Sequence, residues 1–291
     1  MLKSLVVSLR PKQWVKNLIL YAPLVFSRNF FEWNQTLKVT LGVGVFCLLA
    51  GSVYLLNDIV DREKDRLHPL KSKRPLASGA LSAKTAWAAF FLLAGAGAAA
   101  GFASGTLFGV LALGYFALNV AYSFYLKHVV IIDVMVIAIG FVMRVLAGAA
   151  IIEVPATPWL LMCTILLALF LGFAKRRHEL VLLNDSADGH RRVLEHYTPY
   201  FLDQMMPVVS AATVMSYALY TISPETVAHF GTSKLIYTIP FVLYGIFRYL
   251  YLVHLREQGG SPTHAFLSDK PLLINVLLWL AACILIIEGT I

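Results

Sequence analysis

The sequence predicts an all-α protein that crosses a membrane many times. Of its 291 residues, 59% are hydrophobic and only 14% are charged, and the mean hydropathy is +0.74. A soluble globular domain typically carries about 25% charged residues, so the composition argues against a soluble protein. No polar stretch is long enough to bury a core of its own. Residues 1–291 are therefore expected to form one transmembrane domain.

Nine apolar stretches have the length of a membrane-spanning helix, which is about 20 residues. The first, residues 14–31, is the weakest because Lys16 and Asn17 interrupt it and Pro23 would kink it. The third contains the small-residue run AGAGAAAG at 94–101, which would let helices approach closely in lipid. After the first, the predicted spans are residues 37–57, 85–103, 106–126, 129–150, 157–174, 203–222, 234–254 and 271–289.

The distribution of basic residues orients these spans. With the N-terminus inside, the cytoplasmic segments hold 19 of the 24 lysines and arginines, and the opposite face holds Arg28, Lys38 and Lys234. Cytoplasmic loops are enriched in Lys and Arg, so we expect a cytoplasmic N-terminus and a location in the plasma membrane. The net charge of +8 then reflects these loops. Nucleic-acid binding is not expected, because the basic residues lie in separate loops.

The most informative stretch is NDIVDREKDRLHPLKSKRPLASG, Asn57 to Gly79, at the end of the second span. Asp58, Asp61 and Asp65 share one face if the helix continues past the membrane surface. Like charges at this spacing need a partner cation. Carboxylate oxygens suit Mg²⁺, which keeps several waters and bridges carboxylates to phosphates. The alternative is a solvated helix end, neutralised by the basic residues between the carboxylates.

A basic loop follows the carboxylates and favours the metal interpretation. Lys71, Lys73 and Arg74 lie within ten residues of Asp65, in a loop bracketed by prolines. A diphosphate bound through a metal ion needs cationic groups on its other side. The stretch therefore predicts that the carboxylates hold a metal, that the metal holds a diphosphate, and that the basic loop neutralises the remaining charge.

The same stretch closely resembles the NDxxDxxxD motif and the RPLxSG tail of the UbiA superfamily of intramembrane prenyltransferases. The resemblance implies nine helices around a cavity open to lipid, with a Mg²⁺-bound diphosphate at its cytoplasmic end. It also implies that Asp58, Asp61 and Asp65 are metal ligands, with Asn57 nearby. The lipid tail of a substrate would lie in an apolar cleft between helices, although the sequence does not select the residues that line it.

The region after the sixth span departs from the pattern of most members, which carry a second Asp-rich motif there. Here Lys175, Arg176 and Arg177 follow the span directly, and Glu179 comes next among the charged residues. Arginine is suited to bidentate phosphate binding, so a basic cluster opposite the acidic one indicates additional phosphate groups on the substrates. The alternative is an anchor to anionic lipid headgroups.

The sequence also resembles one branch of the superfamily, the decaprenyl-phosphate phosphoribosyltransferases. The stretches that carry this resemblance are LRPKQWVKN, YSFYLKHVVIIDVMVIAIGFVMRVLAG, AKRRHEL and YTPYFLDQM. It implies a Mg²⁺-dependent pentosyltransferase that moves 5-phosphoribosyl from phosphoribosyl diphosphate to a polyprenyl phosphate and releases diphosphate. The alternative is an enzyme of the same fold that moves a prenyl group from a prenyl diphosphate to an aromatic or other acceptor. A transporter is disfavoured because most charges crowd at one face.

Two charged residues of the fifth span are further candidates, because ionisable groups within a membrane are costly. Asp133 is expected to cap its helix or to position Lys127. Arg144 is expected to pair with a carboxylate such as Glu153 or with backbone carbonyls. The sequence leaves open whether the chain forms a homo-oligomer.

The predicted site falls into two sets of residues. The predicted catalytic residues are Asp58, Asp61, Asp65, Lys73 and Arg74. The predicted substrate-binding residues are Lys16, Asn17, Asn57, Lys71, Tyr122, Lys127, Asp133, Arg144, Lys175, Arg176, Arg177 and Glu179.

Overall fold

The all-α prediction is confirmed over the residues that the structure, a computed structural model, describes: 2–67, 71–183, 192–255 and 262–289. Within these ranges no strand is present, and eight helical segments are long and apolar enough to cross a membrane. They are α3 (Trp33–Val60), α5 (Ala83–Ala103), α6 (Thr106–Phe124), α7 (Ile132–Ile151), α8 (Pro158–Leu183), α9 (Pro199–Ile222), η5 with α11 (Lys234–Thr238 and Ile239–Leu255) and α13 (Lys270–Ile287).

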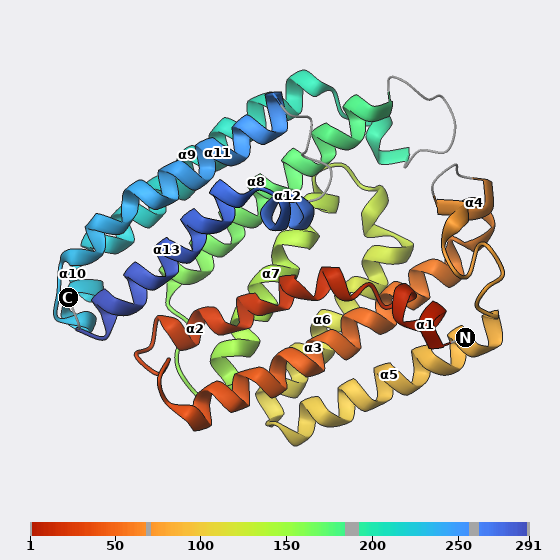
Figure 1. The fold of residues 1–291 in the computed structure, drawn as a ribbon, viewed down its shortest axis with the longest axis horizontal. Coiled ribbons are helices and arrows are strands. Elements are labelled where there is room, and N and C mark those ends of the chain that lie inside the picture. Colours follow the sequence, from red (N-terminus) through yellow and green to blue (C-terminus); the bar gives the residue numbers. More distant parts are fainter. Residues whose placement is uncertain (1, 68–70, 184–191, 256–261, 290–291) are drawn as a thin grey trace.

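Short helices lie between the long ones. Figure 1 shows α9 and α11 along one side of the bundle and α3 and α5 along the opposite side, with α1 and α4 at one end and α10 at the other. We call the end that carries α4 the motif end. The short elements are α1 (Leu2–Ser8), α4 (Arg62–Leu67), η2 (Lys71–Lys73), η3 (Leu126–His128), η4 (Arg192–His196), α10 (Pro224–Phe230) and α12 (Pro262–Ser268).

The first predicted span, 14–31, differs from the expected transmembrane α-helix. It forms a 3₁₀ helix, η1 (Pro11–Tyr21), followed by one α-helical turn, α2 (Ala22–Val25). A 3₁₀ helix rarely exceeds four residues, so tertiary contacts must hold this one. Asn17 is buried and accepts a hydrogen bond from Arg144 of α7. Asn17, one of the two polar residues that weakened the sequence prediction, thus contacts the rest of the bundle.

Small residues allow the closest approaches between helices. Gly97 of α5 lies under Leu49 of α3, and Gly101 faces Gly109 of α6 across a short gap. The packing role expected for residues 94–101 is therefore confirmed. The tightest contact joins α7 to η1, where a Cβ atom at Gly148 would collide with the backbone carbonyl of Leu20.

We expect Gly148→Ala to separate η1 from α7 and to lower the free energy of unfolding by about 1–3 kcal/mol, the usual cost of overpacking. Gly44→Ala on the exposed face of α3 is the matched control, since its Cβ would meet nothing within 4 Å. The measurement is the thermal unfolding midpoint of both variants in detergent. Equal midpoints would show that η1 adjusts freely at this contact.

Candidate active site

The acidic motif lies where α3 ends and α4 begins. α3 ends at Val60, Asp61 leaves the helical conformation with φ −88° and ψ 5°, and α4 starts at the next residue. Hydrogen bonds from the Asp61 amide to the Asn57 carbonyl (2.9 Å) and from the Asp65 amide to the Asp61 carbonyl (2.8 Å) keep the chain close to its helical course. The motif therefore presents its carboxylates on two sides of a broken helix rather than along one stripe.

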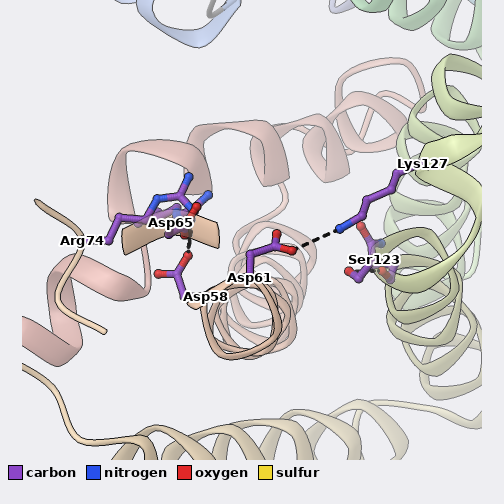
Figure 2. Close-up of polar contacts among 8 residues, drawn as sticks. Asp58, Asp61, Asp65, Arg74, Ser123 and Lys127 are labelled. Atoms are coloured by element: carbon purple, nitrogen blue, oxygen red, sulfur yellow. Dashed lines mark hydrogen bonds and ion pairs between the residues drawn. The ribbon is translucent and has the colours of Figure 1, made fainter. Parts of the chain in front are cut away.

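Two of the three carboxylates converge on one guanidinium group. Arg74 Nη1 contacts Asp65 Oδ2 at 2.6 Å and Asp58 Oδ1 at 3.3 Å, and Arg10 Nη2 contacts the same Asp58 oxygen at 2.5 Å. Both carboxylates are buried, with exposed fractions of 2% and 4%. In Figure 2, Asp65 and Arg74 overlap in the view and Asp58 points toward them. The basic loop thus returns onto the carboxylates, and its predicted contact with a diphosphate stays a prediction.

The third carboxylate faces elsewhere. Asp61 Oδ1 lies 3.6 Å from the Lys127 Nζ atom of η3, and Figure 2 shows this pair on the side of Asp61 opposite Arg74. The prediction of three carboxylates on one face is therefore wrong at Asp61, because the helix breaks there. Among the described residues, no group of three or more acidic, histidine or cysteine side chains lies close enough to hold a metal ion.

The pair Asp58 and Asp65 nevertheless suits a divalent cation. Oxygens of both carboxylates reach the same nitrogen atom of Arg74, so a single positive centre can contact both. Carboxylate oxygens are hard ligands, and Mg²⁺ is typically held by one or two of them, with waters and substrate phosphates completing its shell. The donor set therefore fits Mg²⁺ with two protein carboxylates.

Other residues predicted for this region line its edges. Asn57 is half-buried in the last turn of α3. Lys71 and Lys73 lie in η2, which packs against α4, and Lys73 is exposed. They are thus near the carboxylates in the fold, and their predicted contacts with phosphate remain predictions.

Arg176 is the centre of a buried network rather than an open anion site. Its exposed fraction is 0%. It donates from Nε to Asp133 (2.6 Å), from Nη1 to Glu179 (2.6 Å) and from Nη2 to the Tyr122 hydroxyl (3.0 Å). A phosphate could bind Arg176 only by replacing one of these partners. The network instead ties together the ends of α6, α7 and α8 at the motif end.

Tyr197, which the sequence interpretation overlooked, completes this network. Its hydroxyl donates to Asp133 Oδ1 (2.7 Å) and accepts from the Ile131 amide (2.6 Å). Ile131 has a positive φ of 68°, which is unfavourable for a β-branched residue, so this hydrogen bond holds a strained turn. Burial, and then the bond to Asp133, raise the pKa of Tyr197 above its usual value, so the phenol stays protonated. Asp133 thus accepts hydrogen bonds from Arg176 and Tyr197, in place of the helix cap or the contact with Lys127 that the sequence suggested.

The residues on either side of Arg176 also have carboxylate partners. Lys175 Nζ lies 3.6 Å from Glu179, and Arg177 Nε lies 2.5 Å from Asp203 at the start of α9. All three members of the predicted basic cluster therefore have carboxylate partners in this structure: Lys175 and Arg176 share Glu179, and Arg177 pairs with Asp203 of α9.

Arg144 lies deep in α7 and has neutral partners. It donates to the Asn17 side chain (2.9 Å), the Gly140 carbonyl (3.0 Å) and the Tyr115 hydroxyl (2.5 Å), and its guanidinium lies 4.4 Å from the centre of the Tyr115 ring. The expected pairing with a backbone carbonyl is confirmed, and the alternative pairing with Glu153 is wrong. Arg144 therefore keeps a positive charge that no described carboxylate neutralises by direct contact.

A cavity of about 470 Å³ lies between the helices, within the size range of small-molecule sites. It is lined by residues of η1, α2, α7, α8, α9, α11, α12 and α13, and its walls are mostly apolar. Aromatic residues line the end away from the motif: Trp159, Tyr220 and Trp279. Lys16 is the one charged residue among those that line the described cavity. An apolar cleft between helices, as predicted for a lipid tail, is therefore present.

Comparisons with known proteins agree with this fold. The family described as UbiA prenyltransferase family matches residues 18–269. A decaprenyl-phosphate phosphoribosyltransferase of Corynebacterium glutamicum is 34% identical over 95% of this chain and 84% of its own length. The enzyme of the same name from Mycolicibacterium smegmatis is 31% identical over 96% of this chain and 91% of its own.

Solved structures share the arrangement of helices. A UbiA homolog from Archaeoglobus fulgidus, bound to GPP and Mg²⁺, superposes with a TM-score of 0.74 over 98% of this chain and 99% of its own, at 22% identity. That identity supports the fold alone. Together with the curated relatives, it confirms the resemblance that the acidic motif predicted.

We expect Arg176→Met to destabilise the protein by about 3–5 kcal/mol, because it leaves the buried Asp133 carboxylate unpaired. Lys175→Met is the matched control on the same helix, and its half-exposed pair with Glu179 contributes only about 0–1 kcal/mol. Thermal unfolding in detergent measures both. Unchanged stability together with weaker substrate binding would instead support the phosphate contact predicted for Arg176.

Proposed function

We propose that this chain, which belongs to the UbiA prenyltransferase family, transfers the 5-phosphoribosyl group from phosphoribosyl diphosphate to a polyprenyl phosphate. The bond from the anomeric carbon to the diphosphate oxygen breaks, and its electron pair leaves with the diphosphate. An oxygen of the lipid phosphate forms the new bond to that carbon. The products are polyprenyl-phosphoryl 5-phosphoribose and diphosphate.

The observation that carries this proposal is the surplus of positive charge between the acidic motif and the apolar cavity. Arg144 has only neutral partners, and Lys16 lies in a mostly apolar wall. The proposed donor carries a diphosphate and a separate 5-phosphate, and the acceptor carries a third phosphate. A prenyl transfer to an aromatic acceptor involves one diphosphate and leaves this surplus without a purpose. The curated relatives, at 31–34% identity, carry the name of the same reaction.

The donor diphosphate would bind at the motif end. Asp58 and Asp65 would hold Mg²⁺, as the donor chemistry of this pair and the Mg²⁺-bound structural neighbour support. The bound metal would neutralise charge that develops on the departing diphosphate. Arg74 and Lys127 reach this region from two different loops and would add hydrogen-bond donors to the same leaving group.

The acceptor needs no general base in this reaction. A lipid phosphate is already an anion at neutral pH, so its oxygen requires only alignment with the anomeric carbon. Charge stabilisation of the leaving group and positioning of the two substrates would therefore supply most of the rate. Asp133 and Tyr197 would act through Arg176, by fixing the ends of the helices that carry the contacting residues.

The proposed orientation places the motif end in the cytoplasm. α1, α4 and η3 carry basic residues at this end, and the positive-inside rule assigns such segments to the cytoplasmic side. A water-soluble donor would then reach the carboxylates from the cytosol, while the acceptor would enter from the plasma membrane.

The direct test is to incubate membranes that contain the protein with phosphoribosyl diphosphate labelled in the ribose and with a polyprenyl phosphate. We expect label in an organic-extractable lipid, dependent on the protein and on the phosphate group of the lipid. Polyprenol of the same length is the matched acceptor control. No labelled lipid, together with product from a prenyl diphosphate and an aromatic acid, would overturn the proposal in favour of prenyl transfer.

A second prediction concerns the metal. Asp58→Asn should lower kcat/KM on the order of 10²-fold, because the metal ion that would stabilise the leaving group would be held more weakly. It should also raise the Mg²⁺ concentration needed for half-maximal activity at least tenfold. Glu63→Gln, a change to a carboxylate that is 73% exposed on the adjacent helix, should alter neither quantity. A lower unfolding midpoint with unchanged Mg²⁺ dependence would assign Asp58 a structural role only.

A further inference from the structure

The hydroxyl of Tyr197 joins two parts of the motif end that are distant in the sequence. Tyr197 directly follows η4 and is only 3% exposed, and its partner Ile131 lies 66 residues earlier in the chain. The hydroxyl accepts a hydrogen bond from the Ile131 amide and donates one to Asp133. A phenol carries a single proton, and here that proton is directed to a carboxylate. The hydroxyl therefore serves the protein and not a ligand.

The amide that this hydroxyl binds belongs to a strained turn. Ile131 directly precedes α7, and its φ of 68° and ψ of −45° are rare for a β-branched residue. Such a conformation persists only where surrounding contacts hold it. The Ile131 side chain is 41% exposed, so packing fixes the residue only in part. The hydrogen bond from its amide to Tyr197 is thus a main restraint on the turn.

The same turn carries Lys127, which lies in η3. Backbone hydrogen bonds run from the Val129 amide to the Leu126 carbonyl (3.3 Å) and from the Asp133 amide to the Val129 carbonyl (3.0 Å), and they link η3 to α7 across Ile131. η3 also packs against η4. A change in the conformation of Ile131 would therefore move η3 and the lysine on it.

Lys127 reaches the candidate active site from this loop. Its Nζ atom lies 3.6 Å from Asp61 Oδ1, its side chain is 13% exposed, and Figure 2 shows it directed toward Asp61. Lysine has a flexible four-carbon stem, so the place of its ammonium group depends on where η3 holds its backbone. The proposed function gives this ammonium group a hydrogen bond to the departing diphosphate.

We infer that Tyr197 is a positioning residue for the reaction: its hydroxyl holds the turn at Ile131 and thereby keeps Lys127 beside Asp61, where the donor diphosphate binds. This inference rests on the proposed function for the role of Lys127, and it adds a residue that acts without touching the substrate. Asp133 also accepts a hydrogen bond from Arg176, so it keeps a charged partner when the hydroxyl is absent.

The test is a double-mutant cycle between Tyr197 and Lys127, measured as binding of radiolabelled inorganic diphosphate with Mg²⁺ to the purified full-length protein in nanodiscs. We expect Tyr197→Phe to weaken diphosphate binding about fivefold or more, the effect of weakening one hydrogen bond to a charged group. In a Lys127→Met background the same change should weaken binding less than about twofold, because no ammonium group is left to position.

Turnover gives a second measurement on the same variants. Tyr197→Phe should raise the KM for phosphoribosyl diphosphate about fivefold and leave the KM for the polyprenyl phosphate within about twofold, because only the donor carries a diphosphate. Equal losses of diphosphate affinity with and without Lys127, or an equal rise of both KM values, would assign the hydroxyl a structural role only and overturn the inference.

The substitution removes the hydroxyl and keeps the ring. Tyr197 packs against Phe201 with ring centres 6.1 Å apart, a contact that phenylalanine retains. Tyr200→Phe, at a position that is 74% exposed at the start of α9, is the matched control and should bind diphosphate like the unmodified protein.

A second cycle decides the matter if Tyr197→Phe does not fold. Glycine adopts a positive φ without steric cost, so Ile131→Gly should remove the need of the turn for the hydroxyl. The variant with both changes should then fold and bind diphosphate within about twofold of Ile131→Gly alone. A double variant that does not fold, or that binds more weakly than this, would show that the hydroxyl does not act through the turn.

Inorganic diphosphate is released by phosphoribosyl transfer and by prenyl transfer alike, so its binding separates this inference from the proposed function. Coupling between Tyr197 and Lys127 in a protein that transfers no phosphoribosyl group would support the positioning role and overturn the proposed reaction. Additive effects in a protein that does transfer this group would overturn the positioning role and leave the reaction in place.

Discussion

The hydrocarbon core of a bilayer supplies no hydrogen-bond partners, and the structure depends on this constraint throughout. Backbone groups in the spans are satisfied by helices, and each charged side chain between the spans must find its partners within the protein. Arg144 meets this demand with an amide, a carbonyl and a phenol. Arg176 meets it with two carboxylates and a phenol. Asp58, Asp65 and Arg74 contact one another at the motif end, where the chemistry is proposed to occur.

η1 joins the parts of the structure that the proposed reaction requires. It begins beside Arg10, which contacts the carboxylate of Asp58, and its buried Asn17 binds Arg144 of α7. Its other side lines the apolar cavity through Lys16. A 3₁₀ helix advances farther per residue than an α-helix, so this short segment reaches from the acidic motif into the cavity. The segment whose polar residues made it a weak span thus connects the acidic motif with the apolar cavity.

The predictions that held depended on residues close together in the sequence. Asp58, Asp65 and Arg74 belong to one helix end and the loop that follows it, so the motif alone indicated that they meet. Asp61 does not share a face with Asp58 and Asp65, because the helix breaks at Asp61 and hydropathy does not reveal such breaks; its predicted role as a metal ligand stays a prediction. The sequence also did not predict which partner each residue of the basic cluster would contact. Consecutive residues point about 100° apart around an α-helix, and only packing decides which of Lys175 and Arg176 faces inward.

The sequence by itself determined the helical class, the family and the end of the bundle that carries the charges, because composition, apolar length and a local motif encode them. Only the tertiary structure decided which charges are neutralised and which remain available. Asp133 and Arg176 are 43 residues apart in the chain, and Asn17 and Arg144 are 127 apart. Ion pairs and hydrogen bonds require atoms within a few ångströms of each other. That proximity arises from helix packing, which no single stretch of this sequence specifies.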